Sequence, residues 1–226
     1  MFKLSFYFVR SKKLSHKKFK NLSVKIIDGL GAQMEIKQKC ACYKIFFAIP
    51  YLKLSKYDGI FEVWFESIAS LNEVKNNVEF NSHIQNNNEV FNTSKCSYIV
   101  SEEYPAIFEN EIGSSPERIK FTTLLIKNSD MNFDEFKNHH KEHHIPLFSS
   151  TPIVQKNIKK YVVSHKIEEG NCAKNYNGIV EFWFNNIFSM LVVFMNHEYL
   201  SKVRPDEKKF LNLKKCDFII SKEYAG

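Results

Sequence analysis

The chain is poor in the residues that build loops and disulfide-bonded scaffolds. Its 226 residues include only 7 glycines, 6 prolines and 5 cysteines. The cysteines are odd in number and form no C-x-x-C pair, which argues against a disulfide framework and favours reduced thiols. No apolar run approaches the roughly 18 residues of a membrane-spanning helix, and the apolar N-terminal stretch is too short for a signal peptide. We therefore expect a soluble, cytoplasmic protein that has no membrane partner.

The composition is that of a globular protein with a large aromatic core. Apolar residues make up 44% of the chain and charged residues 25%, which excludes a disordered or fibrous protein. The net charge of +7 raises the question of an acidic partner such as nucleic acid. The densest basic run, Lys12 to Lys20, is also typical of the exposed face of a helix.

The sequence contains an internal repeat. The segment Tyr57–Phe65 (Y-D-G-I-F-E-V-W-F) recurs at Tyr176–Phe184 (Y-N-G-I-V-E-F-W-F), an offset of 119 residues. The segment Lys95–Tyr104 recurs at Lys215–Tyr224, an offset of 120. A period of about 120 is far longer than that of a solenoid repeat and indicates a duplicated domain. We predict repeats at residues 1–108 and 119–226, joined by a linker at 109–118 that contains the turn-forming sequence G-S-S-P.

Each repeat is predicted to have the element order βαββαβ, because strand-like and helix-like patterns alternate in the same way in both. In the second repeat, Asn132 and Glu135 have the spacing of a capping box at the start of the first helix. The expected elements are strands at 2–10, 35–49, 59–66 and 96–104 with helices at 16–30 and 68–78, and strands at 119–127, 157–168, 178–185 and 216–224 with helices from 132 and at 187–198.

The third strand of each repeat has two different faces. Phe61, Val63 and Phe65 share one face, which we expect under the helices, whereas Ile60, Glu62 and Trp64 share the other. Because exposing isoleucine and tryptophan is costly, the second face also needs cover. We therefore predict an α+β fold in which two ferredoxin-like βαββαβ repeats pack sheet to sheet as an intrachain α+β barrel.

Four of the eight histidines lie in one helical segment. His140 and His144 are one turn apart on one side, and His139 and His143 lie on another. The segment lacks the glutamate that follows the first histidine in a zinc-hydrolase helix, and no third ligand is evident. We predict no metal here. A solvated, histidine-rich turn remains an alternative for His139 and His143.

Several motifs of the second repeat resemble the EthD-like family of the dimeric α+β barrel superfamily. Those motifs are Phe136, the pair at 139–140, His144-Ile-Pro-Leu, the strand Tyr176–Phe184 and the segment Pro205–Phe210. The pair at 139–140 is His-His where the family has Tyr-Trp, and Asn177 replaces the usual aspartate. The first repeat keeps the strand motif but not the helix motif. The resemblance thus implies one working site, in the second repeat, and one scaffold copy.

The resemblance and the residue chemistry together define a candidate site. An imidazole titrates near neutral pH, so His144 is the first candidate for general acid–base catalysis. Glu181 is expected beside it as a second acid or an orienting group. The predicted catalytic residues are His144, Glu181 and His140, and the predicted binding residues are Trp183, Tyr161, His165, Trp64 and Glu62. Ordinary packing remains an alternative for His165 and both tryptophans, and a surface or salt-bridged carboxylate remains one for Glu181.

The resemblance implies work on small molecules without fixing the reaction. We expect cofactor-independent proton transfer, by a lyase, cyclase or isomerase, on a small apolar ligand of aromatic or polyketide-like character. An oxygenase of the same superfamily and a non-catalytic binding or interaction protein remain open. RNA binding is least favoured, because Ile60 and Glu62 occupy positions where RNA-recognition modules carry aromatics, so no nucleic-acid partner is expected. The fold also allows a homodimer.

Overall fold

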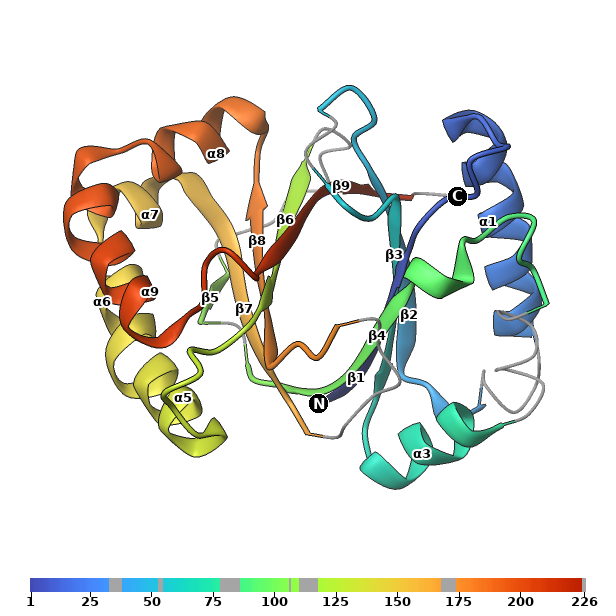
Figure 1. Ribbon diagram of the computed structural model, residues 1–226, viewed down its shortest axis with the longest axis horizontal. Coiled ribbons are helices and arrows are strands. Elements are labelled where there is room, and N and C mark those ends of the chain that lie inside the picture. Colours follow the sequence, from blue (N-terminus) through green and yellow to red (C-terminus); the bar gives the residue numbers. More distant parts are fainter. Residues whose placement is uncertain are drawn as a thin grey trace. The chain divides into compact units, whose positions relative to one another are not determined.

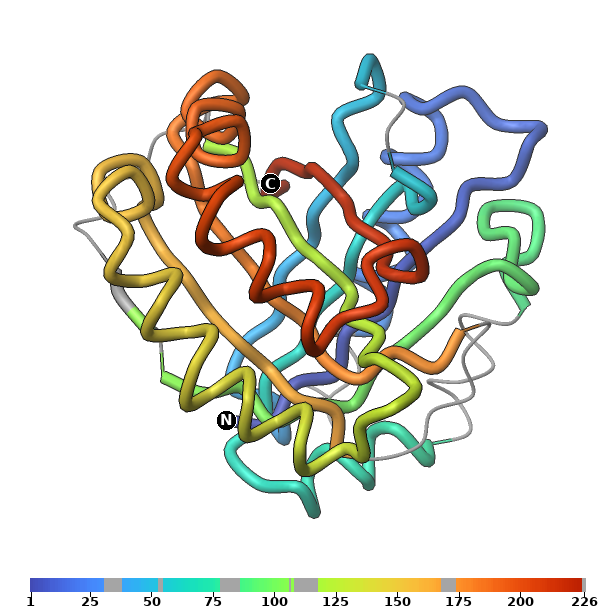
Figure 2. Tube along the Cα trace, turned by 60° about the vertical axis from the view of Figure 1, so that its left-hand side comes forward, coloured from blue at the N-terminus to red at the C-terminus, as the bar shows by residue number. Residues whose placement is uncertain are grey.

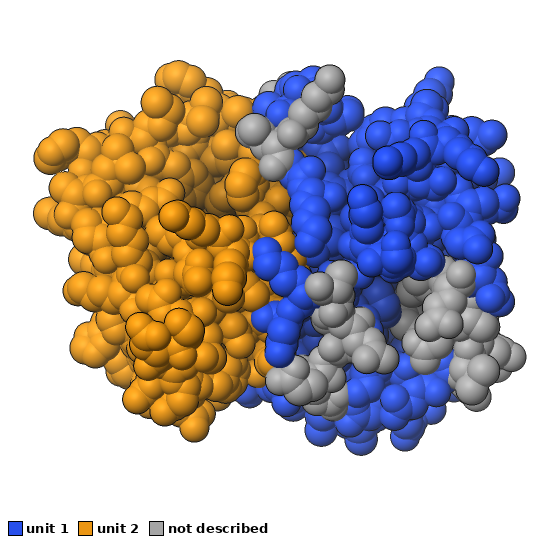
Figure 3. Space-filling view, in the orientation of Figure 1, with its two compact units in different colours: residues 1–103, 167–175, 223–226 blue, residues 104–166, 176–222 orange. Residues whose placement is uncertain are grey.

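The computed structural model describes residues 1–32, 38–52, 55–77, 86–105, 107–109, 118–167 and 174–224. Its contacts divide the chain into two compact units, shown in different colours in Figure 3. Unit 1 contains residues 1–103, 167–175 and 223–226, and unit 2 contains residues 104–166 and 176–222. The units differ from the predicted repeats, because residues 104–108 are grouped with unit 2 and residues 167–175 and 223–226 with unit 1. The predicted linker at 109–118 is grouped with unit 2. Most of the predicted linker lies outside the described residues.

Unit 1 consists of an antiparallel sheet with helices on one face (Figure 1). The strand order is β4-β1-β3-β2, which is the order of a ferredoxin-like βαββαβ unit. The elements are β1 (Phe2–Phe8), α1 (His16–Ala32), β2 (Cys42–Ala48), β3 (Gly59–Phe65), α3 (Ile68–Asn76), the short 3₁₀ turn η1 (Thr93–Lys95) and β4 (Ser97–Glu103). The predicted elements are thus confirmed, and most are shorter at one or both ends.

Unit 2 repeats this order as β9-β6-β8-β7 and extends it with the edge strand β5. Its elements are β5 (Phe108–Glu109), β6 (Ile119–Leu125), α5 (Phe133–His139), η2 (His140–His144), α6 (Ile145–Ser149), α7 (Pro152–Asn157), β7 (Ile158–Lys166), β8 (Gly178–Phe184), α8 (Ile187–Phe194), η3 (Tyr199–Val203), α9 (Arg204–Phe210) and β9 (Asp217–Glu223). The predicted capping box is present: Glu135 N–H donates to Asn132 Oδ1 and Asn132 N–H donates to Glu135 Oε2.

The repeated Tyr-Asp/Asn-Gly sequence closes each unit in the same way. The side chain of Asp58 accepts the N–H of Arg10 at 2.8 Å, and that of Asn177 accepts the N–H of Lys127 at 3.0 Å. The glycine that follows permits close approach of the neighbouring strand. A Cβ on Gly178 would stand 2.8 Å from the carbonyl oxygen of Ser164. The Asp or Asn and the Gly of the motif are therefore structural. They hold in place the third strand of each unit, β3 or β8, which carries the Glu and Trp of the same motif.

The apolar face of each sheet lies under the helices, as the alternation predicted. In unit 1 this core includes Phe61, Val63 and Phe65 together with Phe19 of α1. The second face is also buried: Glu62 and Glu181 are 0% and 1% exposed. Two clusters of polar residues therefore need explanation in unit 2, one among the helices and one on the opposite face of the sheet.

Candidate functional site

A carboxylate held between two imidazoles lies among the helices of unit 2. Asp206 accepts hydrogen bonds from His144 Nδ1 on Oδ2 and from His139 Nε2 on Oδ1, each at 3.1 Å. The hydrogen bond from His144 lowers the pKa of Asp206, and His139 acts in the same direction against the effect of burial. Asp206 is therefore ionised and can only accept, so Nδ1 of His144 carries the proton. Neutral His144 then keeps its basic lone pair on Nε2, which has no hydrogen-bond partner among the described residues.

Two π-helical turns position this pair. His140–His144 form the turn η2, and Tyr199–Val203 form the turn η3 that leads into α9 and Asp206. A proline follows each turn by two residues, at 146 and 205. Proline has no N–H to give to the carbonyl four residues earlier, which favours a widened turn at these points. In Figure 2 the helices of residues 133–149 (yellow-green) and α9 (red) run side by side, which places His144 opposite Asp206.

A second hydrogen-bonded chain adjoins the first. His140 Nδ1 lies 2.9 Å from His165 Nε2, and His165 Nδ1 lies 3.3 Å from the hydroxyl of Tyr104. Burial lowers the pKa of His140 well below its usual value and that of His165 to about 3, so both are neutral at pH 7. In each contact one partner must donate and the other accept. The donor and acceptor roles along this hydrogen-bonded chain can therefore reverse when a proton passes along it.

Aromatic rings surround both chains. The ring of His144 lies 4.9 Å from that of Phe210 and 6.1 Å from that of Phe148, between centroids. Phe136 packs against His165 edge to face at 5.5 Å. His144 is only 6% exposed. This apolar surrounding weakens solvation and strengthens the electrostatic interaction of His144 with the Asp206 carboxylate.

The structure brings His140, His144 and His165 together, but it does not bring the predicted glutamates and tryptophans to them. Phe182 packs against Phe148 and Tyr161, both at 5.0–5.1 Å, so it faces the helices with the histidines. Its neighbours Glu181 and Trp183 therefore face the other way. Glu62 and Trp64 occupy the matching face of unit 1. Asp206, and not Glu181, is the carboxylate that contacts His144, which corrects the expected orienting role of Glu181.

The remaining predicted residues, Tyr161 and His165, have different surroundings. Tyr161 is fully buried among phenylalanine rings, and this burial raises the pKa of its hydroxyl, which is typical of core packing. His165 belongs to the hydrogen-bonded chain. Sequence reasoning missed Asp206 and Tyr104 as site residues, although both lie in segments that it singled out: Asp206 in the Pro205–Phe210 motif and Tyr104 at the end of a repeated strand.

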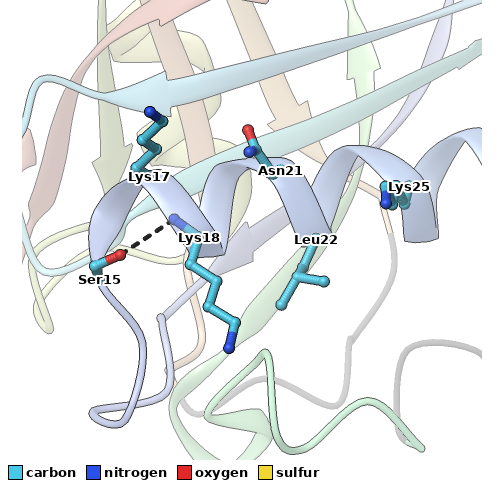
Figure 4. Close-up of a pocket in the computed structure, with 6 residues that line it drawn as sticks. All are labelled: Ser15, Lys17, Lys18, Asn21, Leu22 and Lys25. Atoms are coloured by element: carbon cyan, nitrogen blue, oxygen red, sulfur yellow. Dashed lines mark hydrogen bonds between the residues drawn. The ribbon is translucent and has the colours of Figure 1, made fainter.

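A separate hollow lies along α1 of unit 1 (Figure 4). Its volume is about 270 Å³, and it is lined by Ser15, Lys17, Lys18, Asn21, Leu22 and Lys25. The three lysines are exposed, as predicted for the basic run as a helix face. No buried polar group accompanies them in this lining, so we do not assign it a function.

In the described part of the chain, no group of three or more His, Cys, Asp or Glu side chains is arranged to hold a metal ion. No helix in that part has both the length and the apolar character needed to cross a bilayer. Cys40, Cys42 and Cys96 are free thiols, Cys216 Sγ accepts the N–H of Ile126 at 3.3 Å, and Cys172 lies outside the described residues.

Solved structures similar to this chain show its fold. An anthrone oxidase-like protein aligns over 99% of this chain and 91% of its own, with a TM-score of 0.71 and 9% identity. A protein from Fusobacterium nucleatum subsp. nucleatum provisionally named a monooxygenase aligns over 99% and 92%, with a TM-score of 0.60 and 9% identity. A mutant chlorite dismutase from Candidatus Nitrospira defluvii aligns over 99% of this chain and 91% of its own, with a TM-score of 0.52 and 10% identity.

These similarities confirm the predicted fold class, an α+β fold with two ferredoxin-like repeats in one chain. At such low identities they carry no statement about activity. No curated protein sequence matches the chain significantly. A family model does match part of it: residues 128–214, which include the histidine cluster, Asp206 and the strand motif, match the EthD domain, as the sequence motifs predicted.

Proposed function

We propose that the protein is a small-molecule enzyme in which His144, oriented by Asp206, acts as a general acid–base on an apolar ligand. The observation that carries this proposal is the 3.1 Å contact from His144 Nδ1 to Asp206 Oδ2. It leaves Nε2 as the basic nitrogen and stabilises the imidazolium that forms when a proton arrives there. A positioned imidazole of this kind contributes about 10²–10⁴-fold to a proton-transfer step.

The surroundings of His144 support an apolar ligand. Phe148 and Phe210 flank the imidazole, and no charged side chain except Asp206 is paired with it in the described structure. A carbon acid bound beside this base loses its proton to Nε2. The apolar surroundings keep water away from the base during the transfer. The ring of His140 lies 5.6 Å from that of His144, between centroids, and the contact of His140 with His165 of β7 offers a route by which a proton leaves or returns.

The proton-transfer step can be tested without the natural substrate. 5-Nitrobenzisoxazole is an apolar aromatic probe: a base takes its ring C–H proton, the N–O bond breaks, and a coloured cyano-nitrophenolate forms. We expect the protein to accelerate this reaction over buffer. His144→Gln should lower the rate by about 100-fold, because glutamine cannot accept the proton. Asp206→Asn should lower it less, because the ring remains but its orientation and charge stabilisation are lost.

His143 provides the matched control. It neighbours His144 in sequence, is exposed, and makes only a ring contact with His139 among the described residues. His143→Gln should keep the parent rate. Equal rates for the parent and His144→Gln proteins, with both folded by circular dichroism, would exclude His144 as the base. An unaccelerated parent that still binds apolar ligands would favour the non-catalytic alternative.

An oxygenase is a second candidate, supported by the names of the similar structures. One is called anthrone oxidase-like, and another is provisionally named a monooxygenase. The same base could begin such a reaction: His144 takes a proton from an anthrone-type substrate, and the resulting anion is oxidised by dissolved oxygen. Oxygen uptake with anthrone, measured against buffer and His144→Gln, distinguishes this reaction from simple proton transfer. Uptake equal to that in buffer excludes it.

A further inference from the structure

The second face of each sheet carries the same set of side chains. In unit 1, the first strand supplies Lys3 and Ser5, the third supplies Glu62 and Trp64, and the last supplies Ser101. In unit 2 the matching register positions hold Lys120, Thr122, Glu181, Trp183 and Ser221. All of these except the two tryptophans are at most 1% exposed. The set is independent of the histidine cluster, which lies on the other side of the sheet.

The lysine contacts the glutamate and the tryptophan in both units. Lys3 Nζ lies 3.9 Å from Glu62 Oε1 and 5.6 Å from the centre of the Trp64 ring. Lys120 Nζ forms an ion pair with Glu181 Oε1 and lies 5.1 Å from the centre of the Trp183 ring. Such a cation over an indole ring is attracted by the negative face of the ring. The two faces therefore share one electrostatic arrangement up to this point.

The second faces of the two units differ in the position of one carboxylate. In unit 1, Glu103 Oε2 accepts both from Lys3 Nζ, at 2.8 Å, and from the indole N–H of Trp64, at 2.9 Å. By the repeat, the counterpart of Glu103 is Glu223. Glu223 is grouped with unit 1, and its carboxylate pairs there with Lys44 at 2.8 Å. In the described structure, the indole N–H of Trp183 has no hydrogen-bond partner.

Two further groups of unit 2 suit a carboxylate at this place. Lys160, opposite Trp183 in the β7–β8 ladder, holds a second ammonium 5.6 Å from the centre of the same ring. The hydroxyl of Thr122 is fully buried beside Glu181 and, like that of Ser5 at the matching position of unit 1, has no hydrogen-bond partner among the described residues. A buried hydroxyl without a partner costs roughly 1–3 kcal/mol, which a bound water or ligand removes.

We infer that this face of unit 2 binds the carboxylate of a small organic acid, in the position that Glu103 occupies in unit 1. The ligand carboxylate accepts from the indole N–H of Trp183 and lies near the ammonium groups above its ring. Charge-assisted hydrogen bonds of this kind are about twice as strong as neutral ones. The first repeat thus holds its own carboxylate, whereas the second takes one from solution.

The two tryptophans make the inference directly testable, because they are the only ones in the chain. In a Trp64→Phe protein, all tryptophan fluorescence comes from Trp183. We expect benzoate to change this fluorescence saturably, and benzamide, its neutral counterpart of similar shape, to have no such effect. In a Trp183→Phe protein, which reports on Trp64, benzoate should have no saturable effect, because Glu103 already occupies the position.

Two further variants sharpen the test. Glu103→Gln in the Trp183→Phe protein removes the internal carboxylate and should create a benzoate response at Trp64. Lys160→Met in the Trp64→Phe protein should raise the benzoate dissociation constant by about tenfold through loss of one nearby ammonium. Thermal unfolding by circular dichroism verifies that each variant is folded.

Three results would overturn the inference in folded proteins: no saturable benzoate effect at Trp183, an equal effect of benzamide, or an equal response of Trp64 with Glu103 intact. Because the inference does not involve His144, the 5-nitrobenzisoxazole rates leave it unaffected in either direction.

Discussion

The two units contain the same aromatic cluster with one ring exchanged. In unit 1, Phe19 packs edge to face on Phe47, at 6.1 Å and 90°. In unit 2, Phe136 packs on His165 in the same way, at 5.5 Å and 82°. Phe47 and His165 hold the same register position, opposite the glycine that begins the third strand. The repeat thus replaces a core phenylalanine with an imidazole without changing the packing geometry.

This exchange, together with His140 on the helical side, changes what the cluster can do. Phe47 packs against the ring of Tyr224 at 6.2 Å, an apolar contact. At the matching place His165 has a ring nitrogen 3.3 Å from the hydroxyl of Tyr104. The other ring nitrogen of His165, Nε2, lies 2.9 Å from His140 Nδ1. An aromatic cluster that only stabilises unit 1 has therefore become a hydrogen-bonded chain in unit 2.

Acid should destabilise unit 2 through its buried histidines, and this is the largest effect that we expect. Their pKa is lower in the folded protein than the usual 6.5, so below about pH 6.5 the unfolded chain binds more protons. The stability contributed by the neutral imidazoles is complete above that pH and is lost as the pH falls. For His165, whose pKa falls to about 3, the loss between pH 7 and pH 5 is about 2 kcal/mol.

Urea unfolding at pH 7 and pH 5 measures this loss. His165→Phe restores the residue type of unit 1 and should remove the contribution of His165 to the pH dependence. It should also cost about 1–3 kcal/mol at pH 7, because His140 Nδ1 loses its partner. His143→Gln is the exposed control and should leave the pH dependence unchanged. A pH dependence that His165→Phe does not alter would contradict the assignment.

The strand glycines provide a second contrast, in which the expected difference between the two units is about 1–2 kcal/mol. A Cβ on Gly178 would stand 2.8 Å from the Ser164 carbonyl oxygen, whereas one on Gly59 would stand 3.1 Å from that of Phe46. Both obstacles are backbone, which cannot move aside without shifting a strand. We expect Gly178→Ala to cost about 2–3 kcal/mol and Gly59→Ala about 1 kcal/mol. The free energy of unfolding in urea tests the order, and equal costs would show that both strands relax alike.

The sequence predicted the elements well because the repeat shows the same pattern twice. The alternation along residues 59–65 assigned both faces of the strand, and Asn132 with Glu135 placed the helix start. The site was harder, because contacts between distant segments are not visible in spacing. Asp206 lies 62 residues beyond His144, and the packing of two π-helical turns from separate segments brings them together.

Glu181 illustrates the limit most clearly. Its place in a motif suggested a role beside His144, yet the strand alternation had already assigned it to the face away from the helices. The packing of Phe182 on Phe148 shows that His144 lies on the helix side. The motifs therefore contained residues of two separate clusters. Only the contacts between elements show which residue belongs to which cluster.

The capping side chains at the strand turn offer a third contrast. Asp58 accepts the N–H of Arg10 at 2.8 Å and also contacts the Nε of Arg10 at 3.4 Å. The side chain of Asn177 accepts only the N–H of Lys127, at 3.0 Å, among the described contacts. We expect Asp58→Ala to cost about 1.5 kcal/mol and Asn177→Ala about 1 kcal/mol, because a carboxylate accepts more strongly. Added salt should narrow the difference in unfolding free energy, and an unchanged difference would exclude the charge as its cause.

The second helix of each unit gives the smallest expected effect, and it concerns association. α8 exposes Phe188, Leu191 and Met195, which are 74%, 44% and 72% exposed. By the 119-residue offset, α3 has Ala69, Asn72 and Asn76 at these positions. The segment 187–195 carries no charge in a chain of net charge +7, so two copies can meet there without like-charge repulsion.

We therefore expect weak self-association through α8. In sedimentation velocity, the mean mass of the parent should rise with protein concentration. A triple variant with the residues of α3, Phe188→Ala, Leu191→Asn and Met195→Asn, should remain a monomer. A matched change on the exposed face of α3, Glu73→Gln, should leave association unchanged. Since the buried residues of α8, Met190 and Val193, are untouched, the triple variant should unfold at nearly the parent temperature. Equal association of parent and triple variant would show that the apolar face of α8 does not hold copies together.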